Sequence, residues 1–291
     1  MEPPGPARQR QTHLVSLDLE ALQQELRRAV LEAGVIAMAA FGRGGKVWEK
    51  GPGQVLTETD LAVDDALSAS LGRLLPEAAW LSEETRDDGR RHLCSHVWVV
   101  DPIDGTRSFA QGRPEFTISV ALVAEGRPIL ACLLNPATGE CFEARRGAGA
   151  TLDERPLGVR EPEALDTARI VMSGSERKRR DFSGFFPDAM VSTIGSLAYK
   201  IALVACGRFD AYFSWRRSHD WDIAAALLIL EEAGGRATDR AGAPLALNRQ
   251  SLLHQGLIAA PPGLHAQLAQ ISRDRLEAAG DGTLPVTAAP R

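Results

Sequence analysis

The chain has 291 residues, 44% of them hydrophobic and 24% charged, a composition typical of soluble globular proteins. This length is sufficient for two packed halves. A formal charge of -5 leaves no basic surplus to neutralise a phosphate backbone, so a nucleic-acid polymer is disfavoured as a partner, although a nucleotide could be a small substrate. The four cysteines form no Cys-x-x-Cys pair, which excludes the usual zinc and redox spacings.

The N-terminal segment is rich in proline and polar residues, and we expect residues 1–14 to be disordered. Its start, MEPPGPARQR, has no signal peptide, and no apolar run in the chain is long enough for a transmembrane segment. We therefore expect a cytoplasmic protein.

The first half of the chain predicts two helices and a sheet. Apolar side chains recur at helical spacing over residues 17–41, and a second helix is predicted over 61–75 after a loop over 50–60. Four apolar segments with short connections predict strands over 97–100, 116–123, 128–135 and 139–144. We expect a largely antiparallel sheet flanked by the two helices, in an α+β subdomain over residues 15–160.

The second half alternates strands and helices. Strands are predicted over 169–173, 190–194, 209–214 and 252–259, and helices over 196–206, 223–233 and up to about residue 276. This alternation predicts an α/β subdomain over 166–277 with a partly parallel sheet. A tail over 280–291 is expected to be disordered.

The segment DPIDGT, residues 101–106, places two aspartates at the end of an apolar strand. Pro102 favours an extended Asp101, so we expect the strand to end there and a turn to bring Asp104 to the same side. Two carboxylates this close raise each other's pKa unless a cation lies between them. If 106–111 form a helical turn, its N–H groups make an anion site beside the carboxylates, a pattern typical of magnesium bound to phosphate. An ordinary aspartate turn is the alternative.

Further acidic residues lie where other predicted elements begin or end. Glu83 and Glu84 follow a short apolar strand, Asp222 begins an apolar helix, and Asp60 lies at another helix start. Each aspartate, taken singly, is more often a helix cap than a metal ligand. The six histidines form no obvious cluster, so the sequence indicates no Ser-His-Asp or Cys-His nucleophile.

Taken in order, these residues resemble the inositol monophosphatase superfamily of lithium-sensitive, magnesium-dependent phosphatases. The matching segments are Glu83-Glu84, DPIDGT at 101–106, and Trp221-Asp222 followed by IAA. The resemblance extends over about residues 17–275. It implies the layered sugar-phosphatase fold, a mixed α+β and α/β αβαβα sandwich of two subdomains with the metals in the crevice between them. A homodimer is an expectation by analogy with the family.

The resemblance also implies roles for named residues. Two or three Mg2+ ions would be bound by Glu83, Asp101, the backbone carbonyl of Ile103, Asp104 and Asp222. Thr106 and Glu83 would orient the attacking water, with Asp60 completing this catalytic set. The substrate would contact the N–H groups of Gly105 and Thr106 together with Gly195, Ser196, Lys200 and Asp222.

Within the superfamily, the chain looks closest to the CysQ-type 3′(2′),5′-bisphosphate nucleotidases. LSEE at 81–84, TRSF at 106–109 and Gly195-Ser196 with Lys200 one helical turn later are in their style, whereas Ile103 is the inositol-type choice. We therefore expect hydrolysis of adenosine 3′,5′-bisphosphate to AMP, a role associated with sulfate assimilation. The alternative substrate is inositol monophosphate or another sugar phosphate.

A second phosphate on the substrate would require a cation, and the candidates are Lys200, Arg107, Arg216 and Arg217. A basic pair such as Arg216 and Arg217 is more often part of a solvated loop than a phosphate site. Fructose bisphosphatase is less favoured, because its motif usually has serine after the Asp-Gly pair. A non-catalytic relative is disfavoured, because all the expected acidic ligands and Thr106 are present.

Overall fold

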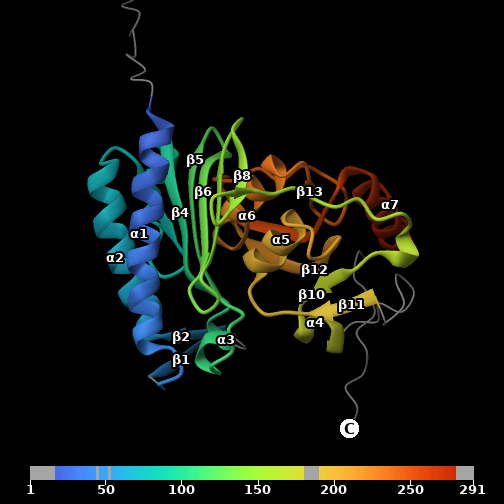
Figure 1. The fold of residues 1–291 in the computed structure, drawn as a ribbon, viewed down its shortest axis with the longest axis horizontal. Coiled ribbons are helices and arrows are strands. Elements are labelled where there is room, and N and C mark those ends of the chain that lie inside the picture. The colour runs from blue at the N-terminus through green and yellow to red at the C-terminus, as the bar shows by residue number, and fades with distance from the viewer. Residues whose placement is uncertain (1–16, 44–45, 52–53, 180–189, 280–291) are drawn as a thin grey trace, which may run out of the picture.

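The computed structural model describes residues 17–43, 46–51, 54–179 and 190–279, which form five layers (Figure 1). Helices α1 (Leu19–Ala40) and α2 (Glu58–Leu74) cover one face of a seven-stranded sheet. Helices α5 (Leu197–Ala205) and α6 (Asp220–Glu232) lie between that sheet and a five-stranded sheet. Helix α7 (Pro262–Ala279) covers the far face of the five-stranded sheet. The predicted αβαβα sandwich is confirmed.

The seven-stranded sheet has the order β3-β4-β5-β6-β7-β8-β9, with β3 parallel to β4 and all other pairs antiparallel. Its strands are β3 (Ala79–Ser82), β4 (His96–Asp104), β5 (Thr117–Ala124), β6 (Arg127–Asn135), β7 (Glu140–Arg145), β8 (Gly149–Leu152) and β9 (Arg155–Pro156). Along β4, Val97 and Val99 pack toward α5 and α6, whereas Trp98 and Val100 pack toward α1 and α2. The predicted antiparallel sheet with helices on its face is confirmed.

The five-stranded sheet has the order β11-β10-β12-β14-β13, parallel on both sides of β10 and antiparallel elsewhere. Its strands are β10 (Ile170–Met172), β11 (Val191–Thr193), β12 (Ala211–His219), β13 (Arg236–Thr238) and β14 (Leu253–Ala260). The predicted partly parallel sheet is confirmed. Strand β12 extends beyond the predicted range of 209–214, because a bulge between Ser214 and Arg217 lets its pairing with β14 continue.

The loop predicted over 50–60 is wrong. It contains β2 (Gln54–Thr57), which pairs with β1 (Val47–Gly51), and the start of α2 at Glu58. The helix begins early because Thr57 and Asp60 cap its first turn reciprocally. Within the described residues there are also four shorter elements: η1 (Arg90–His92), α3 (Thr106–Ala110), η2 (Leu165–Thr167) and α4 (Gly174–Arg179).

Helix α6 lies beside α5 in the central layer of the molecule. Residues 223–230 are all buried, and the helix contacts β4–β8 on one side and β12–β14 on the other. A helix that is apolar on all sides requires such an interior position. Its first turn, which carries Asp222, therefore lies where the two sheets approach each other.

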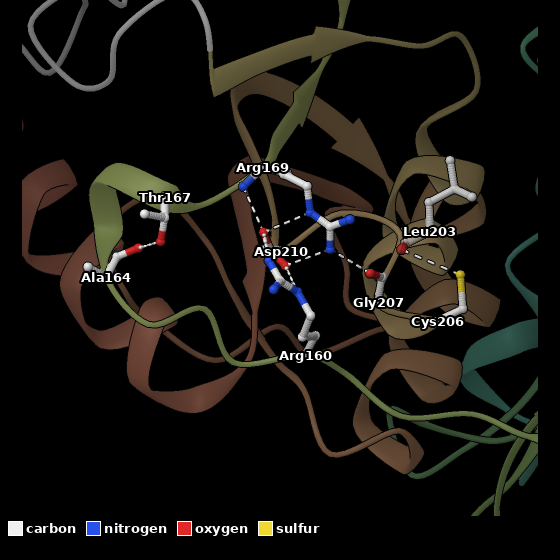
Figure 2. A network of polar contacts seen from close by, with 8 residues as sticks. All are labelled: Arg160, Ala164, Thr167, Arg169, Leu203, Cys206, Gly207 and Asp210. Atoms are coloured by element: carbon white, nitrogen blue, oxygen red, sulfur yellow. Dashed lines mark hydrogen bonds and ion pairs between the residues drawn. The ribbon is translucent and has the colours of Figure 1, made fainter.

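Figure 2 shows the network that ties the segment between the sheets to the start of β12. Asp210 is fully buried and accepts hydrogen bonds from Arg160 Nε at 2.9 Å and from the backbone N–H of Arg169 at 2.7 Å. Arg169 Nη2 also donates to the Gly207 carbonyl at 2.7 Å. Burial alone would raise the pKa of Asp210, but the two arginines outweigh it and lower that pKa to about 2.

The predicted disordered tails, 1–14 and 280–291, lie outside the described residues. The division into subdomains at 15–160 and 166–277 stays a prediction. Among the described helices, none combines the length and the apolar character needed to cross a bilayer.

Candidate active site

Three carboxylates from distant parts of the sequence converge at the end of the seven-stranded sheet. Glu83 follows β3, Asp101 lies in β4 and Asp222 lies in the first turn of α6. Each offers a carboxylate oxygen, and these atoms all lie within 4.8 Å of one another. The parallel pairing of β3 with β4, which aligns Ser82 with Val100, places Glu83 beside Asp101. We call Glu83, Asp101 and Asp222 the carboxylate cluster.

Crowding and burial make the carboxylate cluster electrostatically unfavourable by itself. Burial raises the pKa of Asp101 well above its usual range, and the charges of Glu83 and Asp104 raise it further. Removal from water and the charge of Asp104 also raise the pKa of Asp222, although the His219 N–H, which donates to Asp222 at 2.7 Å, lowers it. Such oxygen-rich sites fit a hard divalent cation, which neutralises the repulsion.

A bulge in β4 explains how the DPIDGT motif aims its aspartates. Asp101 pairs with Ser119 and Asp104 with Thr117, so two residues of β4 oppose one of β5. Pro102 has no N–H and is tolerated at such an irregular position. The prediction that the strand ends at Asp101 is therefore wrong, because the strand continues through the bulge to Asp104. Bulges commonly re-aim side chains at active sites.

Asp104 links this motif to the second half of the chain. Its Oδ2 accepts hydrogen bonds from Ser196 Oγ at 2.5 Å and from the Ala198 N–H at 2.6 Å. It lies close enough for its charge to raise the pKa of Asp101 and Asp222, although it is not among the three mutually close carboxylates. Asp104 therefore both borders the cluster and positions the start of α5.

Thr106 is held in a fixed orientation by two acceptors. Its Oγ1 lies 3.0 Å from Asp60 Oδ1 and 2.9 Å from the carbonyl oxygen of Ile103. The other Asp60 oxygen accepts from the Thr57 N–H at 2.8 Å. Asp60, which is buried, thus serves both as the helix cap and as a partner of Thr106. The two interpretations of this aspartate from sequence are compatible.

The helical turn predicted after Gly105 is present as α3. Gly105 has a φ of +96°, and a Cβ atom there would lie 2.8 Å from the Glu115 carbonyl oxygen and 3.1 Å from Ser196 N. Only glycine allows this conformation and this close approach without strain. The turn that carries Thr106 therefore packs directly against the segment before α5.

Gly195 and Ser196 lie at that close approach. The Gly195 N–H donates to Glu115 Oε2 at 2.8 Å, and a Cβ atom at Gly195 would collide with Ser108 Oγ. Ser196 has a φ of +46°, which is unfavourable for a residue with a side chain. Its Oγ compensates by capping α5 through the Tyr199 N–H at 3.0 Å, while also donating to Asp104.

Lys200 is directed at the backbone of this strained segment. Its buried Nζ donates to the carbonyl oxygens of Ile194, Gly195 and Ser196 at 3.3, 3.1 and 2.5 Å. An ammonium group has three donors, so these carbonyls use all of them. Burial lowers the pKa of Lys200 to about 8, and the charge of Asp104 opposes this shift. The structure thus gives Lys200 a role in holding residues 194–196.

Sequence reasoning missed two acidic residues that support the site. Asp64 accepts from Ser82 Oγ and from Thr85 Oγ1, both at 2.5 Å, and so fixes both sides of Glu83. The sequence could have identified Asp64, because it lies one helical turn after Asp60 on the same face of α2. The bond from Gly195 to Glu115 had no comparable signal, since the two residues are distant in sequence.

The layered αβαβα fold, with acidic residues from three elements meeting beside a glycine-threonine turn, defines a phosphatase of the sugar-phosphatase type. Comparison with known families is more specific, because the model of the inositol monophosphatase family matches residues 18–277. The chain belongs to the inositol monophosphatase family.

Individual relatives agree with this assignment. An inositol-1-monophosphatase from Rhizobium meliloti is 34% identical over 249 residues, which cover 80% of this chain and 91% of the relative. A fructose-1,6-bisphosphatase/inositol-1-monophosphatase from Thermotoga maritima is 32% identical, with coverage of 78% and 88%. Among solved structures, an IMPase from Thermotoga maritima has a TM-score of 0.75 at 28% identity, covering 89% of this chain and 99% of that one. The narrower CysQ-type assignment stays a proposal.

Proposed function

We propose that this protein is a Mg2+-dependent phosphomonoesterase that acts on a small phosphorylated polyol of the inositol phosphate type. The observation that carries the proposal is the carboxylate cluster, whose oxygens lie within 4.8 Å of one another beside Thr106. The names of the relatives from Rhizobium meliloti and Thermotoga maritima support this substrate class. The alternative substrate predicted from the sequence is thus favoured over the nucleotide.

Glu83, Asp101 and Asp222 would hold two or three Mg2+ ions together with Asp104 and the carbonyl oxygen of Ile103. Bound Mg2+ supplies charge neutralisation for the phosphoryl group and lowers the pKa of water in its shell. Phosphoryl transfer needs little covalent assistance, so positioning and charge carry most of the catalysis. The protein's own contribution is to keep these groups in place.

The pair of Thr106 and Asp60 would handle the proton of the attacking water. The Thr106 hydroxyl has one proton, which it donates toward Asp60 Oδ1 or the Ile103 carbonyl, and its oxygen can in turn accept a hydrogen bond. A water that donates to Thr106 Oγ1 is thereby oriented, and its proton can pass to Asp60. Gly105 and Thr106 would hold the phosphate through their N–H groups.

Gly195, Ser196 and Lys200 would contribute the wall next to the substrate. Because Lys200 donates to three backbone carbonyls, we assign it to positioning this wall. Gly195 and Ser196 then approach the body of the substrate with their backbone.

A second candidate activity, release of the 3′-phosphate from adenosine 3′,5′-bisphosphate, is favoured by one observation. Arg216 is exposed on the bulge of β12, where its Nη1 donates to Ser175 Oγ at 3.0 Å, and its charge is close enough to lower the pKa of Asp222. An arginine in this position suits a second phosphate. Arg217 Nε donates to Gln255 Oε1 in β14 at 3.4 Å.

The test is to measure phosphate release from inositol 1-phosphate and from adenosine 3′,5′-bisphosphate with Mg2+ and then with EDTA. A higher kcat/KM for inositol 1-phosphate that is lost with EDTA supports the main proposal. A higher value for the nucleotide, reduced by Arg216→Ala, supports the second candidate. Release that is unaffected by EDTA would contradict both. The homodimer, the cytoplasmic location and the lithium sensitivity stay predictions from the sequence.

A further inference from the structure

A second buried polar network joins the loop that follows Glu83 to the other half of the chain. Its centre is Arg91 in η1, whose side chain is 3% exposed. Arg91 Nε donates to Asp87 at 2.7 Å, while Nη1 donates to Asn248 Oδ1 at 2.9 Å and to the Arg249 carbonyl at 2.8 Å. Asn248 Nδ2 returns a bond to the Arg91 carbonyl at 3.1 Å. The segment around Arg91 and the segment around Asn248 are therefore joined by hydrogen bonds from both side chains and backbone.

The network continues from Asn248 into the first turn of α6. The Asn248 N–H lies 2.5 Å from Asp220 Oδ2, and the other oxygen of Asp220 lies 2.7 Å from His254 Nε2. Asp220 is fully buried and is the first residue of α6, two residues before Asp222. Its position is therefore fixed by β14 and by the Asn248 loop together.

The two ends of this network, Asp87 and Asp220, lie four residues after Glu83 and two residues before Asp222 in the chain. On one side, Asp64 fixes Ser82 and Thr85 around Glu83, and the chain from there to Arg91 is short. On the other side, Asp220 fixes the turn that carries Asp222. Glu83 follows β3 in the first half of the chain and Asp222 lies in α6 in the second half, so their separation depends on contacts between the two halves. Groups behind the direct ligands commonly set the affinity of such a site.

We propose that the bridge from Arg91 through Asn248 to Asp220 is a positioning network that sets the separation of Glu83 from Asp222 and thereby the affinity of the carboxylate cluster for a divalent cation. This inference depends on the proposed metal-dependent function. Asn248 is the best position at which to test it. Its φ is +55°, so glycine can take its place without backbone strain.

Asn248→Gly removes both side-chain bonds to Arg91 but leaves the backbone bond to Asp220. Asn248→Asp keeps an acceptor for Arg91 and also tolerates this conformation. Asp210→Asn is the matched control, because it weakens another buried aspartate-arginine network, the one in Figure 2, which does not contact the cluster. If Asn248→Gly does not fold, Arg91→Gln interrupts the same bridge from its other side.

The experiment is titration calorimetry of the metal-free protein with Mg2+ and with Mn2+, without substrate. Asn248→Gly is expected to raise the Kd for each ion about tenfold or more, which is the typical effect of removing a group that supports metal ligands. Asn248→Asp should recover part of this loss, and Asp210→Asn should bind within about twofold of wild type. If Asn248→Gly binds the ions with wild-type affinity, or if Asp210→Asn loses as much affinity as Asn248→Gly, this inference is wrong but the proposed function is unaffected. A wild-type protein that binds neither ion would overturn the proposed function as well.

Discussion

Replacing Asp101 with asparagine tests the electrostatics of the carboxylate cluster directly. The cluster oxygens lie within 4.8 Å of one another, and at that upper limit two unit charges repel by about 3.5 kcal/mol at an effective dielectric constant of 20. Asp101 is 2% exposed and has two such neighbours, Glu83 and Asp222. Both neighbours are partly exposed, and solvent screening therefore reduces the gain. We expect Asp101→Asn to raise the free energy of unfolding of the metal-free protein by about 2–4 kcal/mol at pH 8.

The pH dependence has a definite sign. Because the pKa of Asp101 is raised in the folded protein, the folded state binds more protons than the unfolded state above the usual aspartate range. Metal-free wild type should therefore lose stability as the pH rises from about 4 through the raised pKa. Asp101→Asn should show a flatter profile.

The assay is urea unfolding with EDTA and with excess Mg2+. Wild type should gain stability from Mg2+, by about 2.7 kcal/mol at a hundredfold excess over Kd, and Asp101→Asn should gain little. Asp166→Asn, at an exposed aspartate in η2, is the charge-matched control and should change stability by less than about 0.5 kcal/mol. An Asp101→Asn variant that is no more stable than wild type in EDTA would refute the reasoning.

Three further predictions follow from the same geometry. Thr106→Val should lower kcat about a hundredfold or more with little change in KM, because Asp60 loses the group through which it contacts water; an unchanged kcat would contradict this role. Gly105→Ala should destabilise the protein by about 2 kcal/mol in urea unfolding, since its φ is +96° and its Cβ would crowd the Glu115 carbonyl. Asp210→Asn should cost about 1–2 kcal/mol at pH 7, a difference that disappears as the pH falls from the usual aspartate pKa toward 2; a difference that persists at pH 2 would rule out its ionisation as the cause.

Local patterns in the sequence were sufficient for the layers and for most acidic residues of the site. The helical spacing over residues 17–41 and the continuous apolar runs at 97–100 and after Asp222 can be read from one chain. The direction of the side chains at the bulges in β4 and β12 could not be predicted from the sequence, because it depends on the register of each strand with its neighbour. The strand continues through Pro102 for this reason, and Arg216 lies in β12 rather than in a loop.

The hydrogen-bond partners of the buried charged side chains also could not be predicted from the sequence. Lys200 was predicted to contact the substrate. Its ammonium group instead donates hydrogen bonds to the carbonyls of a segment that begins six residues earlier, at Ile194. Asp104 was predicted only as a metal ligand, yet it also accepts a hydrogen bond from Ser196 in the second half of the chain. Both contacts lie at Ser196, whose φ of +46° is unfavourable, and the bond to Asp104 joins the two halves of the chain.

The interior position of α6 makes the two halves mutually dependent. Because each sheet covers one side of this helix, a fragment that ends within residues 157–169 would leave a large apolar sheet surface uncovered, and the complementary fragment would expose α6 itself. We expect neither fragment to fold alone, and we expect the two to reconstitute each other when expressed together. The chain would then serve as a split reporter, in which cation binding by Glu83, Asp101 and Asp222 registers the association of whatever proteins are fused to the two pieces.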